Sequence, residues 1–235
     1  MDVNNTNIST MTAIASIDNE IDIQQVREYI QQNKLSYEQS VKNNNTNIGV
    51  IRHPLPKSTA KTKTKEFKNQ VQLHIPLMGN NGKVRQIKIK VFNNGRLHIT
   101  GLQSVCMIKT VLTYVNKFLC DSNVLKIPFN EDIANANIEI VMINMTIDTG
   151  YKINQKIFRD LLIKKYNIYA EFAPKTYAGI NALFEIDGIK QASFLIFQSG
   201  KINIAGARGW QYLHAARDCI EDIIKKERSS IELVP

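Results

Sequence analysis

The sequence predicts an α+β fold built from two pseudo-symmetric repeats, and three observations lead to this prediction. The segments IKVFNNGRLHITG (89–101) and FLIFQSGKINIAG (194–206) share Phe, Gly, Ile and Gly at matching places. In both segments apolar residues alternate on either side of a polar turn, which is typical of a β-hairpin. Apolar residues with helical spacing flank both hairpins. A duplicated pattern of this kind indicates two copies of one structural unit.

Each copy reads in the order strand, helix, hairpin strands, helix. The first helices are expected in NEIDIQQVREYI (19–30) and GYKINQKIFRDLL (150–162). The closing helices are expected in SVCMIKTVLTYVNKFL (104–119) and WQYLHAARDCIEDIIKKE (210–227), where apolar residues recur every three or four positions. We therefore predict a first repeat in residues 1–125 and a second in residues 126–235.

The first repeat is longer than the second. Val26 and Phe92 lie 66 residues apart, whereas the matching Phe158 and Phe197 lie 39 apart, so the first repeat holds about 27 additional residues. The candidate is an aperiodic stretch near 40–70 that is rich in Asn, Lys and Thr. Such a stretch buries too little apolar surface to offset the entropy lost on ordering. We expect a partly disordered loop there.

Composition excludes several function classes. No apolar run approaches the roughly 18 residues of a membrane span, and the N-terminus lacks the layout of a secretion signal. The three cysteines are far apart and have no CxxC pairing, which favours reduced thiols inside a cell. The four histidines show no metal-ligand spacing, and no phosphate loop or nucleophile motif occurs. We predict no enzyme, metal site, cofactor, membrane contact or small-molecule substrate.

Charge indicates the kind of partner. The net charge is +9, and residues 1–120 hold 16 of the 30 Lys and Arg but only 7 of the 21 Asp and Glu. The basic excess therefore lies in the first repeat. A basic surface attracts polyanions before contact, so the distribution favours nucleic acid.

Strand alternation assigns a core face and an outward face to each hairpin. In residues 86–92, Ile87, Ile89 and Val91 share the core side, which leaves Lys88, Lys90 and Phe92 facing outward. A solvent-facing Phe beside lysines is typical of a binding surface, although a helix or a second subunit covering it is an open alternative. Further residues predicted on the outward faces of the two hairpins are His98, Thr100, Leu195, Phe197, Asn203 and Ala205.

The strands that precede the first helices follow the same alternation. Thr10 and Thr12 would face outward from STMTAIASI (9–17), and Asn144 and Thr146 from VMINMTID (141–148). Hydroxyl and amide groups donate hydrogen bonds, and A·T pairs expose only acceptors in the minor groove. These residues therefore suit the minor groove of A·T-rich DNA.

With these residues in view, the chain resembles the TATA-box-binding protein family, in a divergent form like those of large DNA viruses. The most specific match is LIFQSGK (195–201) within residues 177–208, and VFNNGRLHITG (91–101) is the counterpart in the first repeat. The resemblance covers most of residues 8–119 and 138–227. It implies a saddle in which a curved antiparallel sheet of about ten strands carries four helices on its convex side.

The resemblance also implies site residues and a role. The family is a known example of minor-groove binding with aromatic wedges that kink the duplex. Here Phe92, Phe197 and Tyr177 stand at wedge positions, and a fourth wedge would fall near Gln70 or Phe67 or be absent. Phosphate contacts are expected from the basic residues Lys88, Lys90, Arg96, Lys201 and Arg208.

The implied function is that of a promoter-binding transcription initiation factor. Its partners would be A·T-rich, TATA-like duplex DNA, a general initiation factor resembling the TFIIB class, and RNA polymerase. Its location would be the nucleus or a cytoplasmic viral factory. Three departures from the family pattern are Lys90 at an apolar position, Ala205 for a threonine, and Lys175 for an acid in the segment expected to bind the initiation factor. Two alternatives are a nonspecific single-strand binder and a protein-interaction scaffold that has lost DNA binding.

Overall fold

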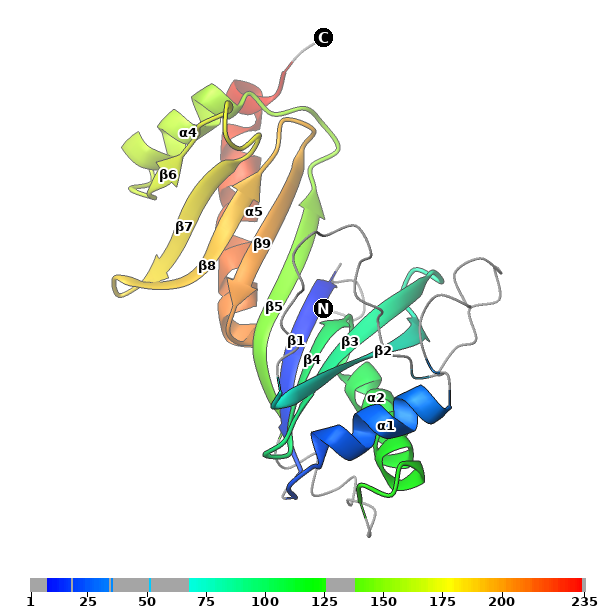
Figure 1. Ribbon diagram of the computed structural model, residues 1–235. Helices are drawn as coiled ribbons and strands as arrows, with labels where there is room; N and C mark the ends of the chain where they lie inside the picture. Colours follow the sequence, from blue (N-terminus) through cyan, green and yellow to red (C-terminus); the bar gives the residue numbers. More distant parts are fainter. Residues whose placement is uncertain are drawn as a thin grey trace. The chain divides into compact units, whose positions relative to one another are not determined.

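The computed structural model (Figure 1) describes residues 8–17, 19–33, 35, 51, 68–125 and 138–233. The chain divides into two compact units, one of residues 12–139 and the other of residues 1–11 and 140–235. The predicted boundary between residues 125 and 126 borders residues 126–137, which lie outside the described residues, so these repeat limits remain a prediction.

The first repeat combines four strands with two helices. Its elements are β1 (Ile8–Ser16), α1 (Ile23–Gln32), β2 (Gln70–Met78), β3 (Val84–Phe92), β4 (Arg96–Leu102) and α2 (Val105–Asp121). The strands lie in the order β2-β3-β4-β1, and β2, β3 and β4 pair antiparallel. Helix α1 packs against β2 and α2 against β4, so the opposite sheet face carries no helix from this repeat (Figure 1).

The second repeat has the same order with one additional short strand. Its elements are β5 (Glu139–Asp148), α4 (Gln155–Lys164), β6 (Ala170–Glu171), β7 (Ile180–Ile186), β8 (Ile189–Ile196), β9 (Lys201–Ala207) and α5 (Trp210–Ile231). The strands lie in the order β5-β9-β8-β7-β6, with antiparallel pairs throughout. Helix α5 runs behind β8 and β9, and α4 packs on β6 and β7 (Figure 1).

Local sequence explains where helices and turns occur. The Asp22 carboxylate caps α1 by accepting hydrogen bonds from the Gln24 and Gln25 amides at 2.9 and 3.0 Å. Asn154 caps α4 in the same way, accepting from the Ile157 amide at 3.3 Å. The hairpin turns end at glycines with positive φ, and the angle at Gly200 is +90°. Because a Cβ at Gly200 would lie 2.1 Å from the Tyr151 carbonyl oxygen, this turn requires glycine.

Equivalent backbone hydrogen bonds establish which residues of the two repeats correspond. In the first repeat the Ile17 amide donates to the Gly95 carbonyl at 3.0 Å, and in the second the Thr149 amide donates to the Gly200 carbonyl at 3.1 Å. The first strands and helices therefore match at a spacing of 132 residues and the hairpins at 105. The difference of about 27 residues lies between α1 and β2, as predicted, and nearly all of the 40–70 segment lies outside the described residues.

The predicted core faces of both hairpins are confirmed. All of the following side chains are fully buried: Ile87, Ile89, Val91, Leu97, Ile99, Phe194, Ile196, Ile202 and Ile204. In β5 the prediction holds only in part, because Ile143 and Met145 are buried while Val141 and Ile147 are half-exposed. The described residues contain nine strands and four helices, which agrees with the predicted α+β class and its four helices.

A buried carboxylate links the helices of the second repeat. Glu227 of α5 is only 5% exposed, and its Oε1 accepts hydrogen bonds from Lys165 Nζ and the Tyr166 hydroxyl, each at 2.6 Å. These bonds lower the pKa of the Glu227 carboxyl below its ordinary value. The bond to Glu227, followed by burial, raises the pKa of Tyr166 to about 12. This cluster joins the end of α4 to α5.

Candidate nucleic-acid interface

The helix-free face of each repeat carries matched rows of side chains that cross neighbouring strands. Lys90 lies opposite His98, and Leu195 lies opposite Asn203 at the equivalent place. Lys88 lies opposite Thr100, and Ser193 opposite Ala205. Since directly opposed residues on one sheet face have Cβ atoms about 4.5–5.5 Å apart, each row forms one continuous contact surface. The sequence-predicted residues of these two hairpins are therefore brought together within each repeat.

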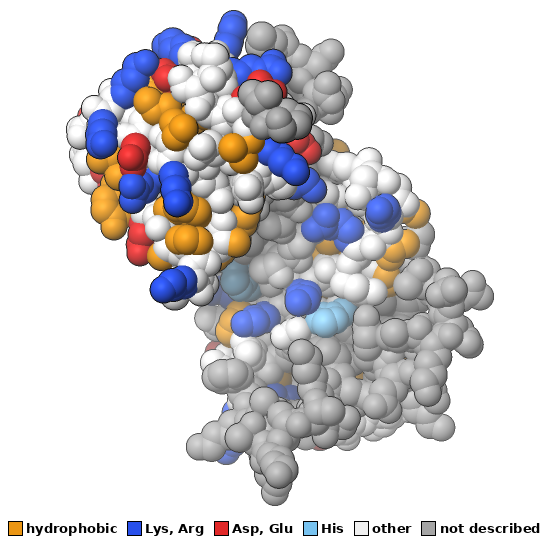
Figure 2. All heavy atoms as spheres, turned by 90° about the horizontal axis from the view of Figure 1, so that it is seen from above, with side chains coloured by type: hydrophobic (Ala, Val, Ile, Leu, Met, Phe, Trp, Pro, Cys, Tyr) orange, Lys and Arg blue, Asp and Glu red, His pale blue; other side chains and the backbone are white. Residues whose placement is uncertain are grey.

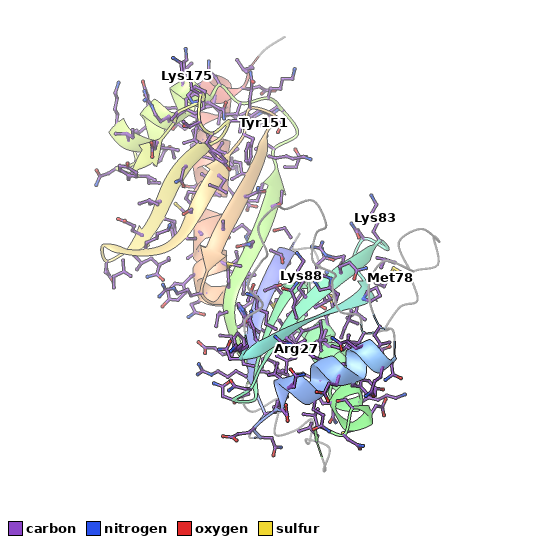
Figure 3. All side chains as sticks on the ribbon, in the orientation of Figure 1. Arg27, Met78, Lys83, Lys88, Tyr151 and Lys175 are labelled. Carbon is purple, nitrogen blue, oxygen red and sulfur yellow. The ribbon has the colours of Figure 1, made fainter. Side chains whose placement is uncertain are left out.

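The first-repeat face is cationic. Lys88 and Lys90 are both exposed, and Lys88 projects from the sheet on the side away from α1 and α2 (Figure 3). Gln72 lies opposite Lys90 and His74 opposite Lys88, with Gln72 Nε2 and His74 Nε2 at 2.8 Å. Figure 2 shows Lys and Arg side chains next to histidine. None of the ion pairs among the described residues involves either lysine, so both charges are available to an anionic ligand.

Phe92 borders a hollow on this face. The ring is half-buried at the end of β3, and the hollow has a volume of about 320 Å³. Its lining residues are Ile14, Phe92, Asn94, Arg96, Leu97 and His98. Arg96 is exposed at the start of β4, where it adds a positive charge at the rim. An aromatic ring in a hollow that a guanidinium and an imidazole also line suits stacking against a base with charge neutralisation nearby.

The second-repeat face is mostly neutral and has ordered amides. The Thr146 hydroxyl donates to Asn203 Oδ1 at 3.0 Å, which connects β5 to β9. Asn144 Oδ1 accepts from the Gly206 amide at 2.7 Å, where the pairing of β5 with β9 shifts register. Because a backbone amide is an obligate donor, this bond identifies which end of the Asn144 side-chain amide is the oxygen. The other end of this half-exposed side chain is therefore the amide nitrogen, which is a hydrogen-bond donor.

Tyr177 and Phe197 form an aromatic pair at one end of this face. Their ring centroids lie 5.9 Å apart in an edge-to-face arrangement, and Tyr177 is 42% exposed. Gly179 lies between them, since a Cβ there would be 2.9 Å from Tyr177 Cε1 and 3.1 Å from Phe197 Cε1. A hollow of about 470 Å³ beside Tyr177 is lined by Glu171, Ala173, Thr176, Tyr177, Gly179, Asn181 and Leu195. Both predicted second-repeat wedges therefore stand together.

The first repeat has no matching pair among its described residues. Gln70 lies opposite Phe92 and so occupies the place of Gly179. Counting back two residues puts the exposed Lys68 at the place of Tyr177. Phe67, the other residue considered for a fourth wedge, lies outside the described residues. In the described part of this repeat Phe92 stands without an aromatic neighbour.

The remaining predicted residues differ in how much surface they offer. Thr10 is half-exposed, and Arg208 is exposed just after β9. Thr12 corresponds to Asn144 but is only 4% exposed, so it offers a ligand almost no surface in this structure. Lys201 corresponds to Arg96 and is exposed, but it pairs across the strands with the acidic Asp148.

Four residues of these faces were not predicted. Gln72 and His74 continue the first-repeat rows, while Asn181 and Glu171 continue the row of Leu195 toward the sheet edge. The signal for Gln72 and His74 was available, because they alternate with the apolar Val71, Leu73 and Ile75, and this alternation assigns 72 and 74 to the outward face. Pairing of the two-residue β6 with β7 has no such signal, since a strand so short shows no period.

The described residues supply no cluster of three or more His, Cys, Asp or Glu side chains that could hold a metal ion. No helix in the same part of the chain is long and apolar enough to cross a membrane.

Comparison with known proteins shows which proteins the chain is similar to in sequence and in fold. No family model matches the chain. The "TATA-box-binding protein-like" protein of Acanthamoeba polyphaga mimivirus is 28% identical over 199 residues, which cover 76% of this chain and 53% of that protein. The chain thus spans about half the length of this curated relative. Methanococcus jannaschii TBP matches with a TM-score of 0.57 and 19% identity, covering 94% of this chain and 98% of that one. The predicted fold is thereby confirmed, and the chain is similar to TATA-box-binding proteins.

Proposed function

We propose that this protein is a promoter-binding transcription initiation factor that binds A·T-rich, TATA-like duplex DNA in the minor groove. The observation that carries the proposal is the helix-free face of each repeat, where an aromatic ring lies two residues along the strand from a row that holds a cation in the first repeat and an amide in the second. Rings of this kind open base steps, and the unstacking cost of a few kcal/mol is offset by wider contact with the bent duplex. No catalytic role is proposed.

The polar groups fit the same ligand. Asn144 Oδ1 accepts from the Gly206 amide, so its nitrogen is the end that can donate to a ligand, and A·T pairs offer only acceptors in the minor groove. Lys88, Lys90 and Arg96 would neutralise phosphates of the adjoining strands, so binding would weaken as salt rises. Bound at a promoter, the protein would help to recruit RNA polymerase through a general initiation factor of the TFIIB class, in the nucleus or in a cytoplasmic viral factory.

A fluorescence anisotropy titration tests this function. We expect tighter binding to an A·T-rich duplex than to a G·C-rich duplex of equal length, and weaker binding by Phe92→Ala and Phe197→Ala. Loss of one stacked ring corresponds to about 1–3 kcal/mol, or roughly 5- to 150-fold in affinity. Equal binding to both duplexes, or unchanged affinity in both variants, would refute the wedge mechanism.

The exposed Tyr177 beside Phe197 also fits a second candidate, a nonspecific single-strand binder that stacks bases on these rings. Competition between the A·T-rich duplex and its separated strands distinguishes the two. Preference for single strands would favour the second candidate. Failure to bind any nucleic acid at low salt, with binding of a protein partner intact, would favour an interaction scaffold.

A further inference from the structure

His98 lies on the helix-free face of the first repeat, in a row with two other polar side chains. It is directly opposite Lys90 of β3, which in turn is opposite Gln72 of β2. The imidazole is half-buried, and it lines the same hollow as the exposed Arg96. A ligand that neutralises the two cations on this face therefore also meets the imidazole.

The strands around His98 supply no carboxylate. None of β1, β2, β3 and β4 contains Asp or Glu. Glu20 lies beside the β3–β4 turn, where the Ile21 amide donates to the Asn93 carbonyl at 2.8 Å, and not on the strands. The charged or titratable side chains that share the face with His98 are all basic, and β1 adds none; they are His74 of β2, Lys88 and Lys90 of β3, and Arg96 of β4. In the described part of this sheet, a positive charge on the imidazole therefore has no acidic partner.

The equivalent position in the second repeat holds a neutral residue with a different environment. Asn203 occupies the place of His98 in the matching pair of strands, and the Thr146 hydroxyl donates to its Oδ1 at 3.0 Å. The residue that matches Thr146 is Ile14, which lines the hollow with His98 but has no polar side-chain group. Ile14 therefore offers the imidazole no hydrogen bond of the kind that orients Asn203.

A histidine is the side chain whose charge changes most readily near neutral pH. The neutral ring has one donor and one acceptor, whereas the imidazolium has two donors. A·T pairs offer only acceptors in the minor groove, and a nearby negative charge favours the protonated ring. We propose that His98 contacts the minor groove as an imidazolium, so that the protein takes up a proton at His98 when it binds duplex DNA. This proposal rests on the proposed function and makes His98 a proton-dependent DNA contact.

Titration calorimetry measures the proton uptake directly. Binding to an A·T-rich duplex is measured at about pH 7.5 in HEPES and in Tris, two buffers with different ionisation enthalpies. The difference between the two binding enthalpies gives the number of protons taken up. An imidazole with the ordinary histidine pKa of about 6.5 is mostly neutral at this pH, so we expect an uptake approaching one proton per bound protein. Because the protonated form binds, affinity should fall by up to about tenfold per pH unit above neutrality.

Two substitutions separate the charge of His98 from its packing. His98→Asn introduces the residue of the second repeat and should remove the uptake and the pH dependence, with weaker binding at about pH 6. His98→Lys is charged throughout this range, so it should bind without proton uptake and more tightly than the wild type at about pH 8. His74→Gln changes the other imidazole of the face, serves as the matched control and should leave the uptake in place. Thermal unfolding checks that all three variants fold.

The outcomes separate this inference from the proposed function. If the wild-type protein binds no duplex, both fail. If it binds the A·T-rich duplex without proton uptake and with constant affinity between about pH 6 and pH 8, the proposed function stands and the proton-dependent contact is overturned. Uptake that persists unchanged in His98→Asn also overturns it, because another group then takes up the proton. Loss of uptake in both His98 variants, with retention in His74→Gln, supports it.

Discussion

Gly179 offers a direct test of whether the Tyr177–Phe197 pair matters. A Cβ at this position would lie 2.9 Å from Tyr177 Cε1 and 3.1 Å from Phe197 Cε1. Non-bonded carbons prefer about 3.5–4.0 Å, so in Gly179→Ala the rings must move. The backbone at Gly179 does not have a positive φ, and alanine therefore adds no backbone strain. The substitution should separate the rings while the fold remains intact.

The expected size of the effect follows from the value of the pair. An aromatic pair contributes about 0.5–1.5 kcal/mol beyond the burial of its area. If the paired geometry forms the wedge, its loss should weaken duplex binding about two- to twelvefold, since 1.4 kcal/mol corresponds to tenfold. Neither ring is removed, so the loss should be smaller than that of Phe197→Ala.

A double-mutant cycle provides the control. Affinity for a TATA-like duplex is measured by anisotropy for the wild type, Gly179→Ala, Tyr177→Ala and the combined variant. In the Tyr177→Ala background the closer of the two contacts is gone, so Gly179→Ala should have little further effect. An equal loss in both backgrounds, or no loss in the wild-type background with unchanged Tm, would show that the contact between the rings plays no part in binding.

Three further predictions concern stability and titration. Tyr166 should ionise near pH 12 when followed by ultraviolet absorbance. The stability that it contributes is therefore fully present below its ordinary pKa of about 10 and is lost as pH rises through about 12. Comparison with Tyr166→Phe identifies its titration, and a Tyr166 signal near pH 10 would contradict this prediction. Because the pKa of Glu227 is lowered, its contribution to the free energy of unfolding is present above the ordinary pKa of about 4.3 and is lost as pH falls below it. In Glu227→Gln the free energy of unfolding, measured in urea, should therefore depend less on pH on the acid side. An unchanged dependence would argue against the cluster. Gly200→Ala should destabilise by more than about 1 kcal/mol, because its Cβ meets the Tyr151 carbonyl. Gly150→Ala, which has a similar positive φ of +77° but open space around it, is the matched control and should cost less in thermal unfolding.

Much of the hairpin geometry could be predicted because strand alternation is a local property. Ile87 and Ile89 are buried and Lys88 is exposed, as period two requires. The same rule was less accurate for β5, where Ile147 is half-exposed. Alternation assigns a residue to a face of a strand, but only the elements packed on that face determine how completely it is buried.

The contacts of the aromatic residues could not be predicted from single segments of the sequence. Tyr177 was identified through its family resemblance, whereas its contact with Phe197 depends on Gly179 and on the pairing of β7 with β8. In the first repeat the pairing of β2 with β3 puts Gln70, not an aromatic residue, opposite Phe92. Register between strands depends on many pairs at once and is not encoded in any one of them.

By itself the sequence determined that this protein is a duplicated α+β unit, which faces of its hairpins are buried, and that its net positive charge lies in the first half. Each of these follows from local periodicity, glycine turns and composition. Only the tertiary structure decided which outward residues stand side by side: Lys90 with His98, Asn144 held by Gly206, and Tyr177 against Phe197. The physical reason is that a binding face is assembled by pairing strands distant in the chain, and their register is set by packing of the whole sheet.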